Sequence, residues 1–258
     1  MADRCLLYYI TGRSEFRGDE PARRRALLDK VAEAARAGVD YIQLREKDLS
    51  TRELEMLARE VVSGVRNSAP LRTENRELRP RLLINSRTDV ALAVGADGVH
   101  LRADDVAPDE VRRMLTIPQG LKPELLSAAS GTAESRALPK SAEVSGHWPR
   151  ATGHFLVAAS CHTVADVLRA ESEKADFAVF GPVFEKKDAR LSLDKTTPAT
   201  GLPALRDACR ARIPVLALGG VTLENAASCL DAGAAGIAAI RLFQENRIED
   251  VVRVLRAL

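Results

Sequence analysis

The sequence lacks the features that mark membrane, secreted or nucleic-acid-binding proteins. No apolar run is long enough to span a bilayer, and the residues after Met1 lead directly into a strand-like run without the apolar core of a signal peptide. The 38 basic and 36 acidic residues leave a net charge of only +2, which gives no reason to expect a nucleic-acid or membrane partner. We therefore expect a cytoplasmic protein.

Cysteine is also scarce, and the four cysteines (Cys5, Cys161, Cys209 and Cys229) lie far apart. None belongs to a C-x-x-C pair or to a spacing typical of metal ligands, which argues against a disulfide framework or a structural zinc site. Hydrophobic residues make up 46% of the chain and charged residues 29%, the usual proportions of a soluble globular protein. The fold is therefore expected to depend on an ordinary hydrophobic core.

Short apolar runs alternate with amphipathic stretches along most of the chain. The apolar runs predict strands near residues 5–11, 39–45, 81–85, 98–101, 155–159, 177–181, 215–219 and 236–240. The amphipathic stretches predict helices near residues 20–37, 51–66, 87–94, 107–115, 163–174, 201–212, 222–232 and 246–257. Strands that are apolar throughout are typical of a parallel sheet covered by helices on its outer face. We expect one α/β domain over residues 1–258, a (β/α)8 or TIM barrel.

Two segments fall outside this alternation. Residues 67–80 are rich in Asn, Arg, Glu and Pro, and predict a long surface loop before the third strand. Residues 116–153 combine proline and glycine with many small polar residues, and are too long for an ordinary barrel connection. We expect a mobile insertion there, between the fourth helix and the fifth strand, on the face opposite the active site.

The second predicted strand ends in a cluster of charge. Gln43, Arg45 and Lys47 alternate along the chain, and a period of two predicts that all three side chains point to one side of the strand. An amide, a guanidinium and an ammonium group at the C-terminal end of a strand suit a polyanion, because barrels of this type bind ligands at that end. The alternative interpretation is a solvated strand end.

Polar residues and glycines follow the other strands at the same end. The polar residues are Tyr8, Thr11, Asn85, Ser86, His100, Asp104, Asp105, Ser160 and His162. Gly219-Gly220 follows the seventh strand and Ile240-Arg241 follows the eighth, where such barrels bind phosphate through backbone N–H groups. Together these strand ends predict a pocket for a phosphorylated ligand.

The chain resembles the thiamine phosphate synthase/TenI family. The matching motifs, in chain order, are L-Y-Y-I-T, Y-I-Q-L-R-E-K-D, L-L-I-N-S-R-T-D-V-A-L-A-V-G-A-D-G-V-H-L, A-S-C-H-T, A-D-F-A-V-F-G-P-V-F, V-L-A-L-G-G-V-T-L-E-N and A-G-A-A-G-I-A-A-I. They span the chain except for the two insertions. The resemblance implies a transferase of thiamine biosynthesis, which joins hydroxymethylpyrimidine diphosphate to thiazole phosphate and releases pyrophosphate.

The resemblance also implies a role for each strand end. The residues expected to hold the diphosphate are Gln43, Arg45, Lys47 and Asn85. Of these, Arg45 and Lys47 are the catalytic candidates, because cations stabilise the charge that develops on a departing diphosphate. Asp105 is expected to bind Mg2+, with Ser86 at the position of the second metal ligand. The pyrimidine pocket is expected to contain Tyr8, His100 and Ser160, and the thiazole phosphate to lie near Gly219, Gly220, Ile240 and Arg241.

Three positions depart from the family pattern. Ser86 stands where the synthases usually have an aspartate, and a serine is a neutral and weaker ligand for Mg2+. Arg241 stands where a serine is usual. The loop after G-P-V-F lacks the usual P-T-x-T-K, so its phosphate-binding lysine would have to be replaced by Lys186, Lys187 or Lys195.

These departures leave other functions open. A TenI-like thiazole tautomerase would use His162 as its acid–base catalyst, since an imidazole titrates near neutrality. The structural alternative is that His162 and Thr163 only begin the next helix. A non-catalytic phosphate-binding regulator and a barrel of the indole-glycerol-phosphate type are further alternatives, although the latter does not explain I-N-S-R or G-V-H-L. A homo-oligomer also stays open.

Overall fold

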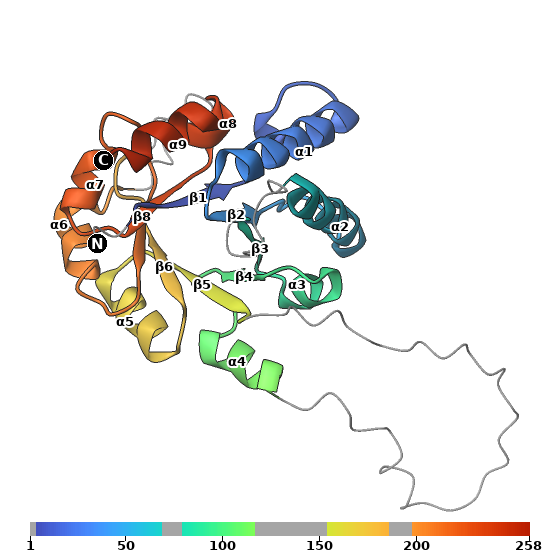
Figure 1. Ribbon diagram of the computed structural model, residues 1–258. Helices are drawn as coiled ribbons and strands as arrows, with labels where there is room; N and C mark the ends of the chain where they lie inside the picture. Colours follow the sequence, from blue (N-terminus) through green and yellow to red (C-terminus); the bar gives the residue numbers. More distant parts are fainter. Residues whose placement is uncertain (1–3, 69–78, 117–153, 186–197) are drawn as a thin grey trace, which may run out of the picture.

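The computed structural model describes residues 4–68, 79–116, 154–185 and 198–258. Within them, eight parallel strands form a closed barrel surrounded by helices (Figure 1). The strands are β1 (Leu6–Ile10), β2 (Tyr41–Leu44), β3 (Arg81–Asn85), β4 (Gly98–Leu101), β5 (Leu156–Cys161), β6 (Phe177–Phe180), β7 (Val215–Leu218) and β8 (Gly236–Ala239). β8 closes the barrel against β1, with Tyr8 opposite Ala238. The predicted (β/α)8 barrel is confirmed.

The helices follow the strands in the expected alternation. They are α1 (Glu20–Ala37), α2 (Thr51–Ser68), α3 (Thr88–Val94), α4 (Pro108–Thr116), α5 (Val164–Ser172), α6 (Gly201–Ala208), α7 (Ala226–Asp231), α8 (Arg241–Gln244) and α9 (Ile248–Arg256), with a 3-10 turn η1 (Arg13–Glu15) before α1. The sequence analysis did not predict α8, because four residues are too few to show a helical period.

Local chemistry fixes several helix ends. Before α5, the Thr163 hydroxyl accepts the Asp166 N–H and the Asp166 carboxylate accepts the Thr163 N–H, a complete capping box. Gly38 and Gly95 end α1 and α3 with φ of 83° and 66°, in the left-handed region that glycine adopts most easily. The ends of α1 and α3, at Ala37 and Val94, are those predicted from the sequence, and α5 begins one residue after its predicted start at 163.

The core has two layers, because side chains on each strand alternate between the barrel interior and the surrounding helices. The interior layer includes Tyr8, Ile10, Leu83, Leu156, Ala158, Phe177, Val179, Leu216 and Ala238. The larger outer layer joins the other strand faces to the helices. The polar residues Gln43 and His100 share the interior layer and are also buried. They require hydrogen-bond partners there.

Several expectations concern residues outside the described ranges. The loop expected at 67–80 begins later than predicted, because α2 continues to Ser68, and residues 69–78 lie outside the description. The insertion predicted near 116–153 lies outside it from residue 117 onward, and so do Lys186, Lys187 and Lys195. Among the described helices, none has both the length and the apolar character needed to cross a membrane.

Candidate active site

The end of β2 separates the three residues that the sequence grouped together. The strand stops at Leu44, so Gln43 lies within it, Arg45 follows it, and Lys47 lies on an exposed turn beyond. The period of two therefore applies to Gln43 and does not fix the direction of Lys47. The Arg45 guanidinium is partly buried, which lowers its pKa, while the nearby Glu46 carboxylate acts in the opposite direction.

A chain of hydrogen bonds crosses the barrel interior from β2 to β5. The Gln43 amide lies 3.1 Å from the Tyr8 hydroxyl, which lies 3.2 Å from Nδ1 of His100. On the other side of the imidazole, Nε2 lies 2.8 Å from the Ser160 hydroxyl. Three of the residues predicted to line the pyrimidine pocket, Tyr8, His100 and Ser160, thus form one connected group. Gln43 belongs to the same group, although the sequence analysis expected it to hold the diphosphate.

The imidazole at the centre of this chain is neutral. Burial lowers the pKa of His100 to about 3, and the charge of Arg45 acts in the same direction. Because the Gln43 amide donates to Tyr8, the Tyr8 hydroxyl donates to Nδ1, and the Nε2–H group then donates to Ser160. The Ser160 hydroxyl proton is left to point toward a ligand. The chain therefore presents a neutral, oriented donor, which suits an uncharged heterocycle.

The adjacent ends of β3 and β4 hold the predicted metal ligands. Ser86 has a φ of 60°, an unusual value for a residue with a side chain, and its N–H group donates to the His100 carbonyl. The Ser86 hydroxyl accepts a hydrogen bond from the Asn85 amide at 3.0 Å. Asp105 acts on the pKa of His100, and one of its oxygens accepts the Arg102 N–H at 2.7 Å. Its other oxygen lies 3.5 Å from the Arg102 guanidinium. One carboxylate, paired with Arg102, and one hydroxyl thus lie beside β4.

His162 lies at the end of β5 and is exposed. Its Nδ1 lies 2.6 Å from the Gly181 carbonyl, so Nδ1 carries the proton and donates it. Its own N–H group donates to Asp166, within the capping box of α5. Both contacts hold the residue between β5 and β6, which is what the structural interpretation of His162 requires.

The ends of β7 and β8 have the tight backbone expected of a phosphate site. Gly219 and Gly220 have φ of 95° and 65°. A Cβ at Gly219 would lie 2.6 Å from Pro182, so a side chain would clash there as well as strain the backbone. After β8, Ile240 precedes α8, which begins at Arg241. The described structure thus places the predicted thiazole-phosphate residues at the same end of the barrel as Arg45 and Ser160.

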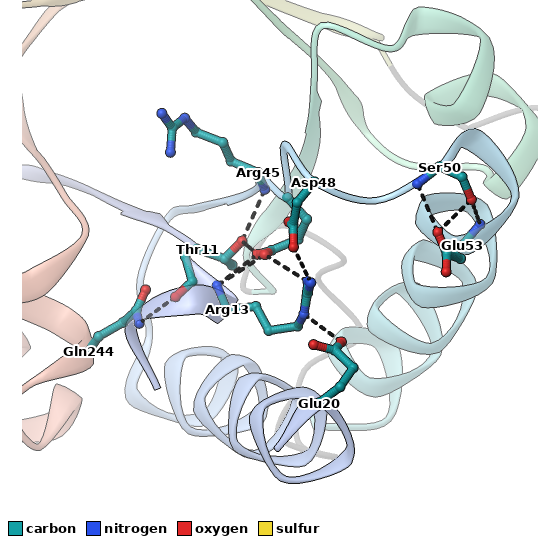
Figure 2. A network of polar contacts seen from close by, with 10 residues as sticks. Thr11, Arg13, Glu20, Arg45, Asp48, Ser50, Glu53 and Gln244 are labelled. Carbon is teal, nitrogen blue, oxygen red and sulfur yellow. Dashed lines mark hydrogen bonds and ion pairs between the residues drawn. The ribbon is translucent and has the colours of Figure 1, made fainter. Parts of the chain in front are cut away.

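One buried ion pair near this end was missed by the sequence analysis. Glu46 follows Arg45, but its side chain is only 2% exposed and its carboxylate lies 3.6 Å from the Arg13 guanidinium. The same guanidinium binds Asp48 at 2.6 Å and Glu20 at 2.7 Å (Figure 2). In the sequence, Glu46 stands between two cations and looks solvated, and Arg13 is 33 residues away. No sequence signal pairs the two.

Comparison with known proteins points to one family. The family model described as "Thiamine monophosphate synthase" matches residues 7–119 and 142–243. A putative thiamine-phosphate synthase 2 of Aquifex aeolicus is 32% identical over 240 residues, which cover 93% of this chain and 97% of that protein. A thiamine-phosphate synthase of Methanoculleus marisnigri is 32% identical over 252 residues, which cover 97% of this chain and 93% of that protein.

A solved structure agrees with the sequence relatives. Thiamine phosphate pyrophosphorylase from Pyrococcus furiosus superimposes with a TM-score of 0.65 and 25% identity, covering 99% of this chain and 95% of that one. The expected family and the transferase class are therefore confirmed, and the names of the relatives favour the synthase over the other functions considered. The chain belongs to the thiamine monophosphate synthase family.

Proposed function

We propose that this protein is a thiamine-phosphate synthase that joins hydroxymethylpyrimidine diphosphate to thiazole phosphate and releases pyrophosphate. The observation that carries this proposal is the Arg45 guanidinium beside a neutral polar chain. Among the described residues, no hydrogen bond or ion pair engages this guanidinium, although it is partly buried. A cation beside a neutral heterocycle pocket fits a substrate that has a diphosphate attached to an aromatic ring.

The residues divide the work between the two parts of that substrate. Ser160, oriented by His100, donates to the pyrimidine, and Tyr8 and Gln43 hold His100 in the required tautomer. Arg45, Lys47 and Asn85 bind the diphosphate and stabilise the negative charge that accumulates on it when its bond to the methylene carbon breaks. Gly219, Gly220, Ile240 and Arg241 hold the phosphate of the thiazole, whose nitrogen attacks that carbon.

The proposal includes Mg2+, although few side chains at the site can act as its ligands. Within the described residues, no group of three or more His, Cys, Asp or Glu side chains is placed to hold a metal ion. Asp105 and Ser86 offer one carboxylate and one hydroxyl, and Mg2+ is commonly bound by one or two carboxylates together with substrate phosphates. The residues therefore fit Mg2+ when the diphosphate supplies further oxygens. Bound there, Mg2+ would neutralise charge on the leaving group.

The test mixes the purified protein with both phosphorylated precursors and follows pyrophosphate release with and without Mg2+. We expect condensation that depends on Mg2+. Isomerisation of a thiazole carboxylate phosphate without condensation would contradict the proposal. In a second step, Ser86→Asp should lower the Mg2+ concentration needed for half-maximal rate several-fold, because it adds a carboxylate and Asp tolerates a positive φ better than most residues. An unchanged Mg2+ requirement would remove Ser86 from the metal site.

Two further properties belong to the same proposal. We expect a cytoplasmic enzyme, because its substrates are phosphorylated and the described helices include no membrane span. A homo-oligomer is compatible with the family, and sedimentation of the purified protein would measure its state directly.

A further inference from the structure

The buried Glu46 carboxylate contacts the loop after β1 through two kinds of donor. It accepts the Thr11 hydroxyl at 2.7 Å and the Arg13 N–H at 3.0 Å. The Arg13 guanidinium adds the ion pair already described. A buried carboxylate is costly unless such partners satisfy it, and here burial still raises the pKa of Glu46 despite these partners. A solvated glutamate would avoid this cost, so the position of Glu46 calls for a reason.

Thr11 connects this carboxylate to the candidate diphosphate ligand. Its hydroxyl donates to Glu46, and its oxygen also accepts the backbone N–H of Arg45 at 3.0 Å. Thr11 is completely buried, so its hydroxyl forms these two hydrogen bonds and none with solvent. Figure 2 shows the Arg45 side chain extending away from the network, on the side opposite Arg13. The hydrogen bond from the Arg45 N–H to Thr11 thus holds the backbone from which the guanidinium projects.

The loop that Thr11 begins also contacts the other expected phosphate site. The Gln244 amide of α8 donates to the Gly12 carbonyl at 3.1 Å. A Cβ added to Gly12 would lie 3.3 Å from Ile240, so the loop packs closely against the end of β8. Residues 11–13 therefore lie between the end of β2 and the start of α8, and contact both.

We propose that Thr11 and Glu46 are positioning residues, which hold the backbone of Arg45 so that its guanidinium meets the diphosphate of the substrate. This inference rests on the proposed function for its substrate. The reason lies in geometry: a bidentate contact between a guanidinium and a phosphate tolerates only small errors in placement, and Arg45 has no side-chain partner among the described residues to hold it. The hydrogen bond to its N–H group supplies the missing constraint.

Thr11→Val and Thr11→Ser are a matched pair for the test. Valine keeps the shape of threonine but removes both hydrogen bonds, whereas serine keeps the hydroxyl and removes only a methyl group. Calorimetry with inorganic pyrophosphate measures the diphosphate site without turnover. We expect Thr11→Val to weaken pyrophosphate binding about tenfold or more and to raise KM for the pyrimidine diphosphate similarly, with KM for thiazole phosphate within about twofold. Thr11→Ser should stay within about threefold of the wild type on each measure.

A stability control separates positioning from general loosening. Asp97→Asn perturbs a partly buried ion pair at the opposite end of the barrel, and should lower the unfolding midpoint without changing pyrophosphate affinity. Should Thr11→Val not fold, Glu46→Gln replaces it, since it keeps the volume but loses the charge, and about a threefold or greater loss of affinity is expected. Equal behaviour of the valine and serine variants, or unchanged pyrophosphate affinity in Glu46→Gln, would overturn the proposal.

The outcomes also distinguish this inference from the proposed function. Condensation by the wild type together with unaltered pyrophosphate affinity in Thr11→Val would leave the function in place and remove the positioning role. Pyrophosphate binding that needs the Thr11 hydroxyl, in a protein that performs no condensation, would support the positioning role and contradict the function.

Discussion

The two ends of the barrel differ in how they use some of their charged side chains. At the N-terminal end, three aspartates each precede an even-numbered strand and bind the chain of the strand before it. Asp40 accepts the Leu7 N–H at 2.7 Å, Asp97 accepts the Leu82 N–H at 2.9 Å, and Asp176 accepts the Val157 N–H at 2.6 Å. In each case the aspartate N–H donates back to the carbonyl of the same partner residue. We call these three reciprocal contacts the aspartate clamps.

Each clamp is completed by arginine. Asp97 forms a bidentate pair with Arg79, with both contacts at 2.7 Å. Asp40 binds Arg256 at 2.7 Å, and Asp176 binds Arg112 at 2.5 Å. The carboxylates at this end are thus engaged by partners within the chain.

The C-terminal end is organised differently. Arg45 has no side-chain partner among the described residues, and the Ser160 hydroxyl is oriented from below. Ser86 holds a backbone conformation that costs free energy. The polar groups at the N-terminal end thus stabilise the fold, whereas some of those at the C-terminal end can still bind a ligand. Substitutions at the two ends should therefore affect different measurements.

The largest effect on stability is expected at the N-terminal end. Asp97→Ala leaves the buried Leu82 N–H without its acceptor and breaks the pair with Arg79, which should lower the free energy of unfolding by about 3 kcal/mol. Urea denaturation measures this, and KM for both substrates should be unchanged in the folded fraction. A raised KM would mean that the two ends are coupled.

The matching change at the C-terminal end is Arg45→Ala. We expect kcat/KM for the pyrimidine diphosphate to fall by the equivalent of about 2–4 kcal/mol, since no neighbour reproduces a bidentate guanidinium contact. The unfolding midpoint should barely change, because the guanidinium has no partner to lose among the described residues. A loss of tenfold or less would count against the assignment of this strand end to the diphosphate.

The buried imidazole predicts a pH dependence. His100 has an ordinary pKa of 6.5 when unfolded and about 3 when folded, so the unfolded chain binds an extra proton between these values. The neutral imidazole therefore contributes its full stabilisation above about pH 6.5, and the free energy of unfolding decreases as the pH falls from 6.5 toward 3. At pH 5 this decrease is about 2 kcal/mol.

Denaturation at pH 7.5 and pH 5 tests this through the difference between wild type and His100→Gln. The glutamine variant should lose less stability than the wild type over that interval, because its side chain has no proton to gain on unfolding. Equal pH slopes for the wild type and His100→Gln would show that His100 can be protonated without unfolding.

The smallest effect is expected from adding a fourth aspartate clamp. Ala235 precedes β8 as the three aspartates precede β2, β4 and β6, and its N–H donates to the Val215 carbonyl as theirs do to their partners. Ala235→Asp should supply an acceptor for the Val215 N–H and raise the free energy of unfolding by about 1 kcal/mol at most. Destabilisation would show that the arginine partners, rather than the backbone contacts, make the clamps favourable.

The barrel was predictable from the sequence because its elements are local. Apolar runs identified every strand and amphipathic stretches identified most helices, and α1 was predicted with its observed bounds, Glu20–Ala37. The strand ends were predictable too, since they follow from the strands. Once the barrel was predicted, the positions of Arg45 and His100 at one end of it followed from the strand ends alone.

The contacts between distant residues were not predictable. The tautomer of His100 depends on Tyr8, 92 positions away, and the pairing of Glu46 with Arg13 spans 33 residues. A single sequence does not show which distant residues are in contact. A glutamate next to a lysine, such as Glu46, therefore looks like a solvated residue. Lys47 is a different case: β2 ends at Leu44, so the alternation along the strand does not fix the direction of the Lys47 side chain, and its role stays a prediction.

The aspartate clamps also divide the chain into modules. Each joins an odd-numbered strand to the strand that follows, β1 to β2, β3 to β4 and β5 to β6. The segments at 69–78, 117–153 and 186–197 all fall between these pairs and never within one. A chain cut in any of these segments would keep the hydrogen bonds between each aspartate and its partner strand within one fragment. The arginines are less local, because Arg256 would be separated from Asp40 by every such cut and Arg112 from Asp176 by a cut within 117–153. The chain could thus be lengthened at these junctions without breaking the contacts between each aspartate and the preceding strand.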